Sequence, residues 1–125
     1  MQGKWAAAIM AATIAAGGLV TAAHADSINW KIRSFHKNAV DVNFHSQNRK
    51  HIWPAVGRVY TLRDFNIANM KIGCVKGEQI CYGAGVKGDY KISWGVGIDG
   101  KTACKGCCQT CNGDTQTTVF NLNER

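Results

Sequence analysis

Apolar and polar residues alternate with a period of two along most of the chain after residue 25. The two clearest runs have their apolar residues at Ile28, Trp30 and Ile32, and at Val40, Val42 and Phe44. Because successive side chains of a β-strand point to opposite faces, this spacing predicts strands with one buried face. Further short runs lie at residues 60–63, 70–72, 90–98 and 120–122. No amphipathic helical pattern of ten residues or more is present, so the alternation predicts a chain of strands.

Turn-forming residues separate these runs, among them Asp99-Gly100 and the segment Gly77-Glu78. Glycine is favoured at the first central position of a type II′ turn, so Gly77-Glu78 is predicted to be a two-residue hairpin turn. Such a hairpin would place Cys74 opposite Cys81. About seven short strands at close spacing predict an all-β domain, a small antiparallel sandwich or barrel.

Residues 1–25 have the features of a secretory signal peptide. Lys4 makes the start positive, residues 6–20 are apolar and uncharged, and Ala23 and Ala25 supply small side chains before the expected cleavage site. This run of 15 residues is shorter than the ~20 that a membrane span needs, so we expect removal after Ala25. The sequence therefore predicts a secreted or periplasmic product, residues 26–125, that forms a single disulfide-rich β domain without a transmembrane segment.

All six cysteines lie in the second half of the chain, at Cys74, Cys81, Cys104, Cys107, Cys108 and Cys111. In an oxidising compartment an even set of cysteines predicts disulfides that stabilise the small domain. We expect at least one bridge from Cys74 or Cys81 into the segment 104–111, and no bridge between the neighbours Cys107 and Cys108. Zinc binding by the Cys104–Cys111 cluster and a redox role for Cys104 and Cys107 are the alternatives. The leading interpretation includes no metal and no cofactor.

The chain is basic, with a net charge of +7 that becomes +6 once Lys4 is removed. A basic surface favours acidic partners. The loop 47–53 combines positive charge with an aromatic ring. Together with the polar strand face around His45 and Arg63, it supplies the predicted binding residues Arg49, Lys50, His51, Trp53, His45 and Arg63. The leading hypothesis is a non-enzymatic module that binds an anionic polymer or a protein partner, without specific nucleic-acid recognition. For Trp53, capping one end of the core is the competing role.

The sequence holds no clear catalytic constellation. The carboxylates show no cluster typical of glycosidases or calcium loops. Two histidines and a lysine close together, His45, His51 and Lys50, can in principle cleave RNA by general acid–base chemistry. A small secreted hydrolase of ribonuclease type is therefore the alternative to the binding module.

Several segments together resemble small exported cysteine-rich modules of proteobacteria, which have no assigned activity. They are Ser46–Arg49, His51–Pro54, Gly77–Ala84, Trp94–Gly97 and the cluster Cys104–Cys111. The resemblance covers most of residues 28–122. It implies an extracytoplasmic module, sometimes appended to other domains, and supplies no catalytic residues.

Overall fold

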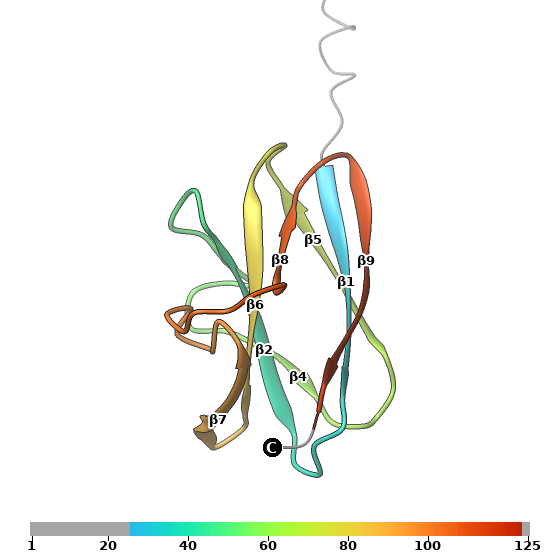
Figure 1. Ribbon diagram of the computed structural model, residues 1–125, viewed down its shortest axis with the longest axis vertical. Coiled ribbons are helices and arrows are strands. Elements are labelled where there is room, and N and C mark those ends of the chain that lie inside the picture. Colours follow the sequence, from blue (N-terminus) through green and yellow to red (C-terminus); the bar gives the residue numbers. More distant parts are fainter. Residues whose placement is uncertain (1–25, 124–125) are drawn as a thin grey trace, which may run out of the picture.

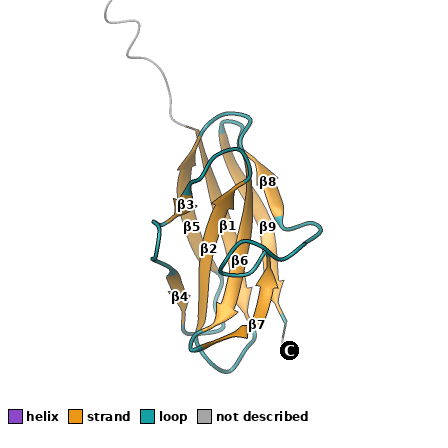
Figure 2. Ribbon diagram, turned by 90° about the vertical axis from the view of Figure 1, so that its left-hand side faces the viewer, coloured by secondary structure: helices purple, strands orange, loops and turns teal. Residues whose placement is uncertain are grey.

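Two β-sheets face each other in the computed structural model, which describes residues 26–123 (Figure 1). The nine strands of this range are β1 (Asp26–Ser34), β2 (Val40–Ser46), β3 (Ile52–Trp53), β4 (Tyr60–Leu62), β5 (Ala68–Cys74), β6 (Gln79–Val86), β7 (Asp89–Gly95), β8 (Cys108–Thr110) and β9 (Asp114–Leu122). The first sheet has the order β5-β1-β9. The second has the order β3-β2-β6-β7, with β4 also paired to β2 and β8 to β6 (Figure 2).

The predicted all-β sandwich with disulfides is confirmed. Residues 26–123 contain no helix, and every strand pair except β1 and β9 is antiparallel. None of the described residues forms a helix of sufficient length and apolar character to traverse a bilayer. The predicted signal peptide, residues 1–25, lies outside the described residues, as do residues 124–125.

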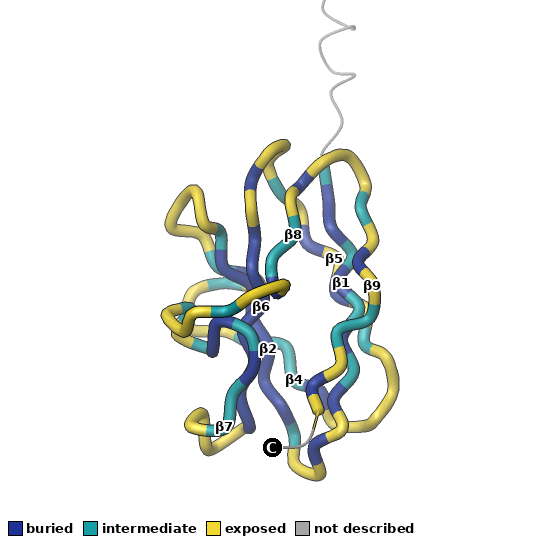
Figure 3. The backbone as a smooth tube through the Cα atoms, viewed as in Figure 1, coloured by how far each residue is buried: buried dark blue, intermediate teal, exposed yellow. Residues whose placement is uncertain are grey.

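The core lies between the two sheets and includes the alternating apolar residues of β1 and β2. Figure 3 shows buried stretches along both strands. Trp30 is fully buried, and its ring lies 4.8 Å from that of Phe44 and 5.6 Å from that of Phe120. Offset aromatic pairs at such distances add to the stabilisation that burial gives. The period-two pattern in the sequence therefore located the inner faces of β1 and β2 correctly.

The second sheet is covered on both faces over part of its area, which the alternation does not predict. All of β6 from Ile80 to Val86 is buried, because the segment after β7 folds back over its outer face. A Cβ atom at Gly83 would lie only 1.9 Å from the carbonyl oxygen of Gly97, so this close approach requires glycine. The run 90–98, predicted to be one strand, ends instead at Gly95, whose φ of 63° turns the chain.

The predicted hairpin at Gly77-Glu78 is wrong. β5 belongs to the first sheet and β6 to the second, so the turn carries the chain across the sandwich. The Glu78 N–H donates to the Val75 carbonyl at 2.9 Å, which makes Lys76 and Gly77 the central residues; Gly77 has a φ of 87°. Because the two strands do not pair, Cys74 and Cys81 do not face each other.

All six cysteines form disulfides, Cys74–Cys111, Cys81–Cys108 and Cys104–Cys107. The expected bridging from Cys74 and Cys81 into segment 104–111 is confirmed for both cysteines. Cys74–Cys111 links the end of β5 to the residue that follows β8, so it joins the two sheets. Cys81–Cys108 joins the paired strands β6 and β8.

We predict that replacing Cys74 and Cys111 together by serine lowers the free energy of unfolding by about 3 kcal/mol, because the bridge spans 37 residues and its loss frees the unfolded chain. Urea denaturation measures the effect. The matched control replaces Cys104 and Cys107, which are 3 residues apart, and should lose half as much or less. Equal losses of stability in the two double variants would contradict the expectation that the longer-range bridge contributes more.

Candidate functional site

The loop between β2 and β3, residues 46–51, is held in one shape by hydrogen bonds at both ends. The Ser46 N–H donates to the His51 carbonyl at 3.0 Å, and the Ser46 hydroxyl accepts the Arg49 N–H at 3.2 Å. The loop is also attached to the start of β6. The Gln47 N–H donates to the Gln79 carbonyl at 2.8 Å, and the Gln79 N–H donates to the Asn48 side-chain oxygen at 2.7 Å. The loop therefore presents its side chains from a fixed backbone.

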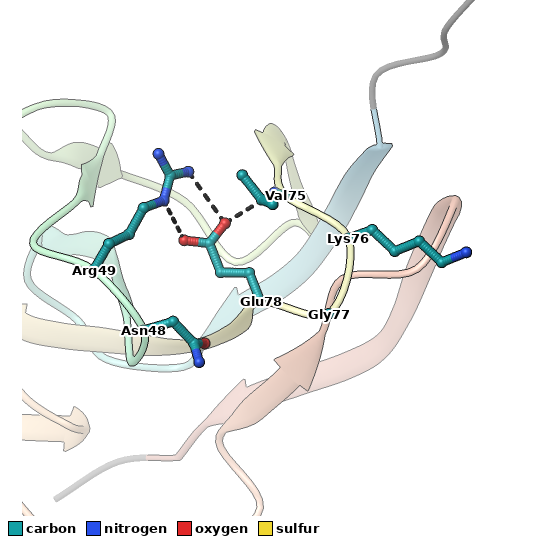
Figure 4. A pocket seen from close by; sticks show the side chains of 6 residues that line it. All are labelled: Asn48, Arg49, Val75, Lys76, Gly77 and Glu78. Carbon is teal, nitrogen blue, oxygen red and sulfur yellow. Dashed lines mark hydrogen bonds and ion pairs between the residues drawn. The ribbon is translucent and has the colours of Figure 1, made fainter.

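Glu78 is the residue that ties this loop to the crossing between the sheets. Its side chain is 2% exposed and accepts hydrogen bonds from Arg49, at 2.5 Å to Oε2 and 3.1 Å to Oε1. The Val75 N–H donates to Oε1 at 2.9 Å (Figure 4). The Ser46 hydroxyl donates to Oε2 at 2.5 Å. The carboxylate is thus saturated by donors from two separate segments.

Burial alone would raise the pKa of Glu78, because the charged form loses its hydration. The hydrogen bonds from Arg49, Ser46 and Val75 outweigh that effect and hold the pKa at about 2. Glu78 is therefore ionised at every pH at which the protein is expected to work. Sequence reasoning treated it as a turn residue, since no local pattern connects it to Arg49, 29 positions away.

Arg49 and Trp53, both predicted to bind a ligand, are engaged within the fold. The Arg49 guanidinium pairs with Glu78 and lies 5.5 Å from the ring centroid of Trp53. Trp53 is 7% exposed and sits beside Phe44 in the register of β2 and β3. The competing role that the sequence offered for Trp53, as a cap on the end of the core, is therefore the one that the structure shows.

Lys50 and His51 remain accessible on the same loop. Both are exposed, and the His51 ring packs edge-on against Trp53 at 4.4 Å. Among the described residues, no carboxylate oxygen lies within 4.0 Å of the Lys50 amine. The two side chains line an open cleft of about 420 Å³, whose lining also includes Ile52, Val56 and Gly100. This cleft, with Lys50 and His51, is the candidate site.

His45 was predicted on an open polar face, and the structure corrects this. The ring is 7% exposed, its Nε2 lies 2.8 Å from the Asn43 side-chain oxygen, and Gly100 approaches it so closely that a Cβ there would be 2.6 Å from Nδ1. Burial lowers the pKa of His45, against the opposing effect of the Asp99 charge. His45 therefore forms a neutral, buried part of the wall of the cleft.

Arg63 does not belong to this site. It follows β4, whose Leu62 pairs with Val40 at the first residue of β2, whereas the loop 46–51 follows the last. Because a strand advances about 3.4 Å per residue, Arg63 lies some 20 Å along the sheet from Ser46. The structure brings together Arg49, Lys50, His51, Trp53 and His45, and leaves Arg63 apart.

Asp41 is a second buried carboxylate, and it lies outside the candidate site. It is 2% exposed and accepts hydrogen bonds from the hydroxyls of Thr61 and Tyr90, each at 2.7 Å, with the Lys87 amine at 3.9 Å. The bond to Asp41 raises the pKa of Tyr90 to about 12, with burial adding to the shift. Arg49 and Lys87 are the only basic side chains in residues 26–123 that have a carboxylate within 4.0 Å.

The zinc alternative depended on the cluster Cys104–Cys111, and of these four cysteines Cys107 and Cys108 belong to the group of neighbouring sulfur atoms found among the described residues, with Cys81 as its third member. The sulfur atoms of Cys81, Cys107 and Cys108 lie within 4.8 Å of one another. Zinc needs thiolates, and each of these sulfurs is bonded to another sulfur. Metal binding at this cluster would therefore require the bridges to be reduced first.

Comparisons with models of protein families, with curated proteins and with solved structures found no match to this chain. The resemblance to exported cysteine-rich modules therefore stays a prediction, and the candidate site rests on geometry.

We predict that Glu78→Gln lowers the free energy of unfolding at pH 7 by about 2–3 kcal/mol, since each unit of pKa shift is worth about 1.4 kcal/mol and the partner Arg49 loses its counter-charge. The stabilisation is present above pH 4.5, the usual pKa, and is lost as the pH falls towards about 2. Urea denaturation between pH 2 and 7 should give a steep loss for the parent and a flatter profile for the variant. Asp89→Asn, at an exposed carboxylate, is the control and should behave as the parent does.

Proposed function

We propose that this protein is an exported, non-enzymatic module that binds an anionic polymer through Lys50 and His51 at the cleft beside the loop 46–51. The observation that carries the proposal is the pairing of Arg49 with the buried Glu78. Because Arg49 satisfies this carboxylate, the charge of Lys50 next to it is left available to a partner. Three disulfides support export, since such bridges persist in oxidising compartments.

The overall positive charge of the chain also favours an anionic partner. Thirteen of the fifteen Lys and Arg residues lie in the described part of the chain, and only Arg49 and Lys87 have a carboxylate partner there. Unpaired positive charge attracts polyanions at long range, while the cleft supplies the close contact. A polymer with repeated anionic groups can use both, which is why we favour it over a compact protein partner.

We predict that Lys50→Ala combined with His51→Ala weakens binding to a sulfated polysaccharide such as heparin three- to tenfold at low salt, because the charged contact of Lys50 and the hydrogen-bonding ring of His51 are both lost. Elution from a heparin column on a salt gradient, followed by titration, measures it. Lys37→Ala, which removes an exposed lysine in the turn between β1 and β2, is the matched control for charge. Equal weakening in the control would show that net charge alone, and no site, binds the polymer.

Arg49→Ala is unsuitable for this purpose. It would leave Glu78 buried without its counter-ion, so a loss of binding could reflect a loss of folding.

The cleft also keeps the hydrolase alternative testable, because His45 and His51 both line it. The two rings are held differently, His45 by Asn43 under Gly100 and His51 against Trp53. We expect purified protein to leave single-stranded RNA intact over hours, since no second ionisable group is hydrogen-bonded to either ring among the described residues. Cleavage by the parent that disappears in His51→Ala would replace the binding module by the hydrolase.

A further inference from the structure

The Cys104–Cys107 disulfide differs from the other two in what it connects. It lies in the loop between β7 and β8 and joins residues only 3 positions apart. The other bridges span 37 and 27 residues and tie strands together. Between the Thr102 N–H, which donates to Val96, and the Cys107 carbonyl, which accepts from Tyr82, no backbone hydrogen bond anchors the described chain. Opening this bridge would therefore displace no strand.

Its two sulfur atoms differ in their access to solvent. Cys104 is partly exposed, and its neighbours Ala103, Lys105 and Gly106 are exposed, whereas Cys107 is 2% exposed. An incoming thiolate can therefore reach Cys104 and not Cys107. Lys105 places a positive charge beside the position where a thiolate must approach, which favours the anionic nucleophile.

The buried end of the bridge touches a second disulfide. The Cys107 sulfur lies 3.9 Å from that of Cys108, and the Cys81 sulfur is within 4.8 Å of both. A thiolate released at Cys107 is thus next to the Cys81–Cys108 bridge. Cys74 and Cys111 are absent from this group of neighbouring sulfurs.

We propose that Cys104–Cys107 is a thiol–disulfide exchange site that accepts two electrons from a dithiol. One thiolate of the dithiol attacks the Cys104 sulfur; a mixed disulfide forms, and Cys107 leaves as a thiolate that takes up a proton. The second thiolate of the dithiol then attacks the first sulfur of the same dithiol, which is bonded to Cys104 in the mixed disulfide. This attack releases Cys104 as a thiolate, which takes up a proton. The dithiol is oxidised to a disulfide, and the protein gains two thiols.

Reduction can then move inward by one step. The Cys107 thiol gives up its proton again and attacks the Cys81 sulfur as a thiolate; a Cys81–Cys107 bond forms, and Cys108 leaves as a thiolate that takes up the proton. No electrons enter or leave the protein in this step. The order of opening is therefore Cys104–Cys107 first, Cys81–Cys108 second and Cys74–Cys111 last, although Cys74 and Cys108 are themselves partly exposed.

The test is partial reduction of the native protein with limiting dithiothreitol, trapping of free thiols with an alkylating reagent, and peptide mapping by mass spectrometry. We expect the first two labels on Cys104 and either Cys107 or, after the inward step, Cys108. First labels on Cys74 or Cys111, or loss of all three bridges together, would overturn the proposal. This measurement needs no variant, so it does not depend on how a mutant folds.

A second measurement asks whether the site oxidises a substrate. Stoichiometric protein is mixed with a reduced dithiol peptide, and the peptide disulfide is followed by chromatography. We expect the parent to oxidise the peptide at least tenfold faster than the double variant Cys104→Ser, Cys107→Ser, which keeps the two strand-linking bridges. Lys105→Ala should slow the reaction about two- to threefold. Equal rates for the parent and the double variant would refute an exchange site.

Discussion

The buried carboxylate of Glu78 is the interaction on which the shape of the candidate site depends. It lies in the connection that crosses from the first sheet to the second, and its donors come from that connection and from the loop 46–51. A buried charge is tolerated only with a full set of partners, so the positions of Ser46, Arg49 and Val75 are determined together. Lys50 and His51 follow Arg49 directly, and their positions are set by the same contact.

The covered outer face of β6 provides the second constraint. Gly83 lets the segment after β7 lie directly on the strand, and Gly100 then packs against the ring of His45. This segment removes His45 from solvent and also supplies one wall of the cleft beside Lys50. A residue that looks like a surface histidine in the sequence is thus part of the support for the site.

The parts of the fold that depend on local pattern could be predicted, and the parts that depend on distant partners could not. The inner faces of β1 and β2 follow from alternation alone, and the involvement of Cys74 and Cys81 follows from the even number of cysteines. The turn at Gly77 was misplaced because β5 and β6 belong to different sheets, and the residues around the turn do not indicate which sheet each strand joins. The role of Glu78 escaped detection because its partner Arg49 is 29 residues away. The burial of His45 was not predicted because the residues that bury it, 97–100, are distant in the sequence.

The distribution of positive charge has a physical cost that the disulfides can offset. Only two basic side chains among residues 26–123, Arg49 and Lys87, pair with a carboxylate, and the two carboxylates are buried. The other basic side chains add mutual repulsion to the folded state. A domain of this size has a modest core, so it gains little from burial to compensate. Cys74–Cys111 and Cys81–Cys108 supply stability that does not depend on charge, because they restrict the unfolded chain. Covalent links therefore allow the surface to stay basic, which is the property that binding an anionic polymer requires.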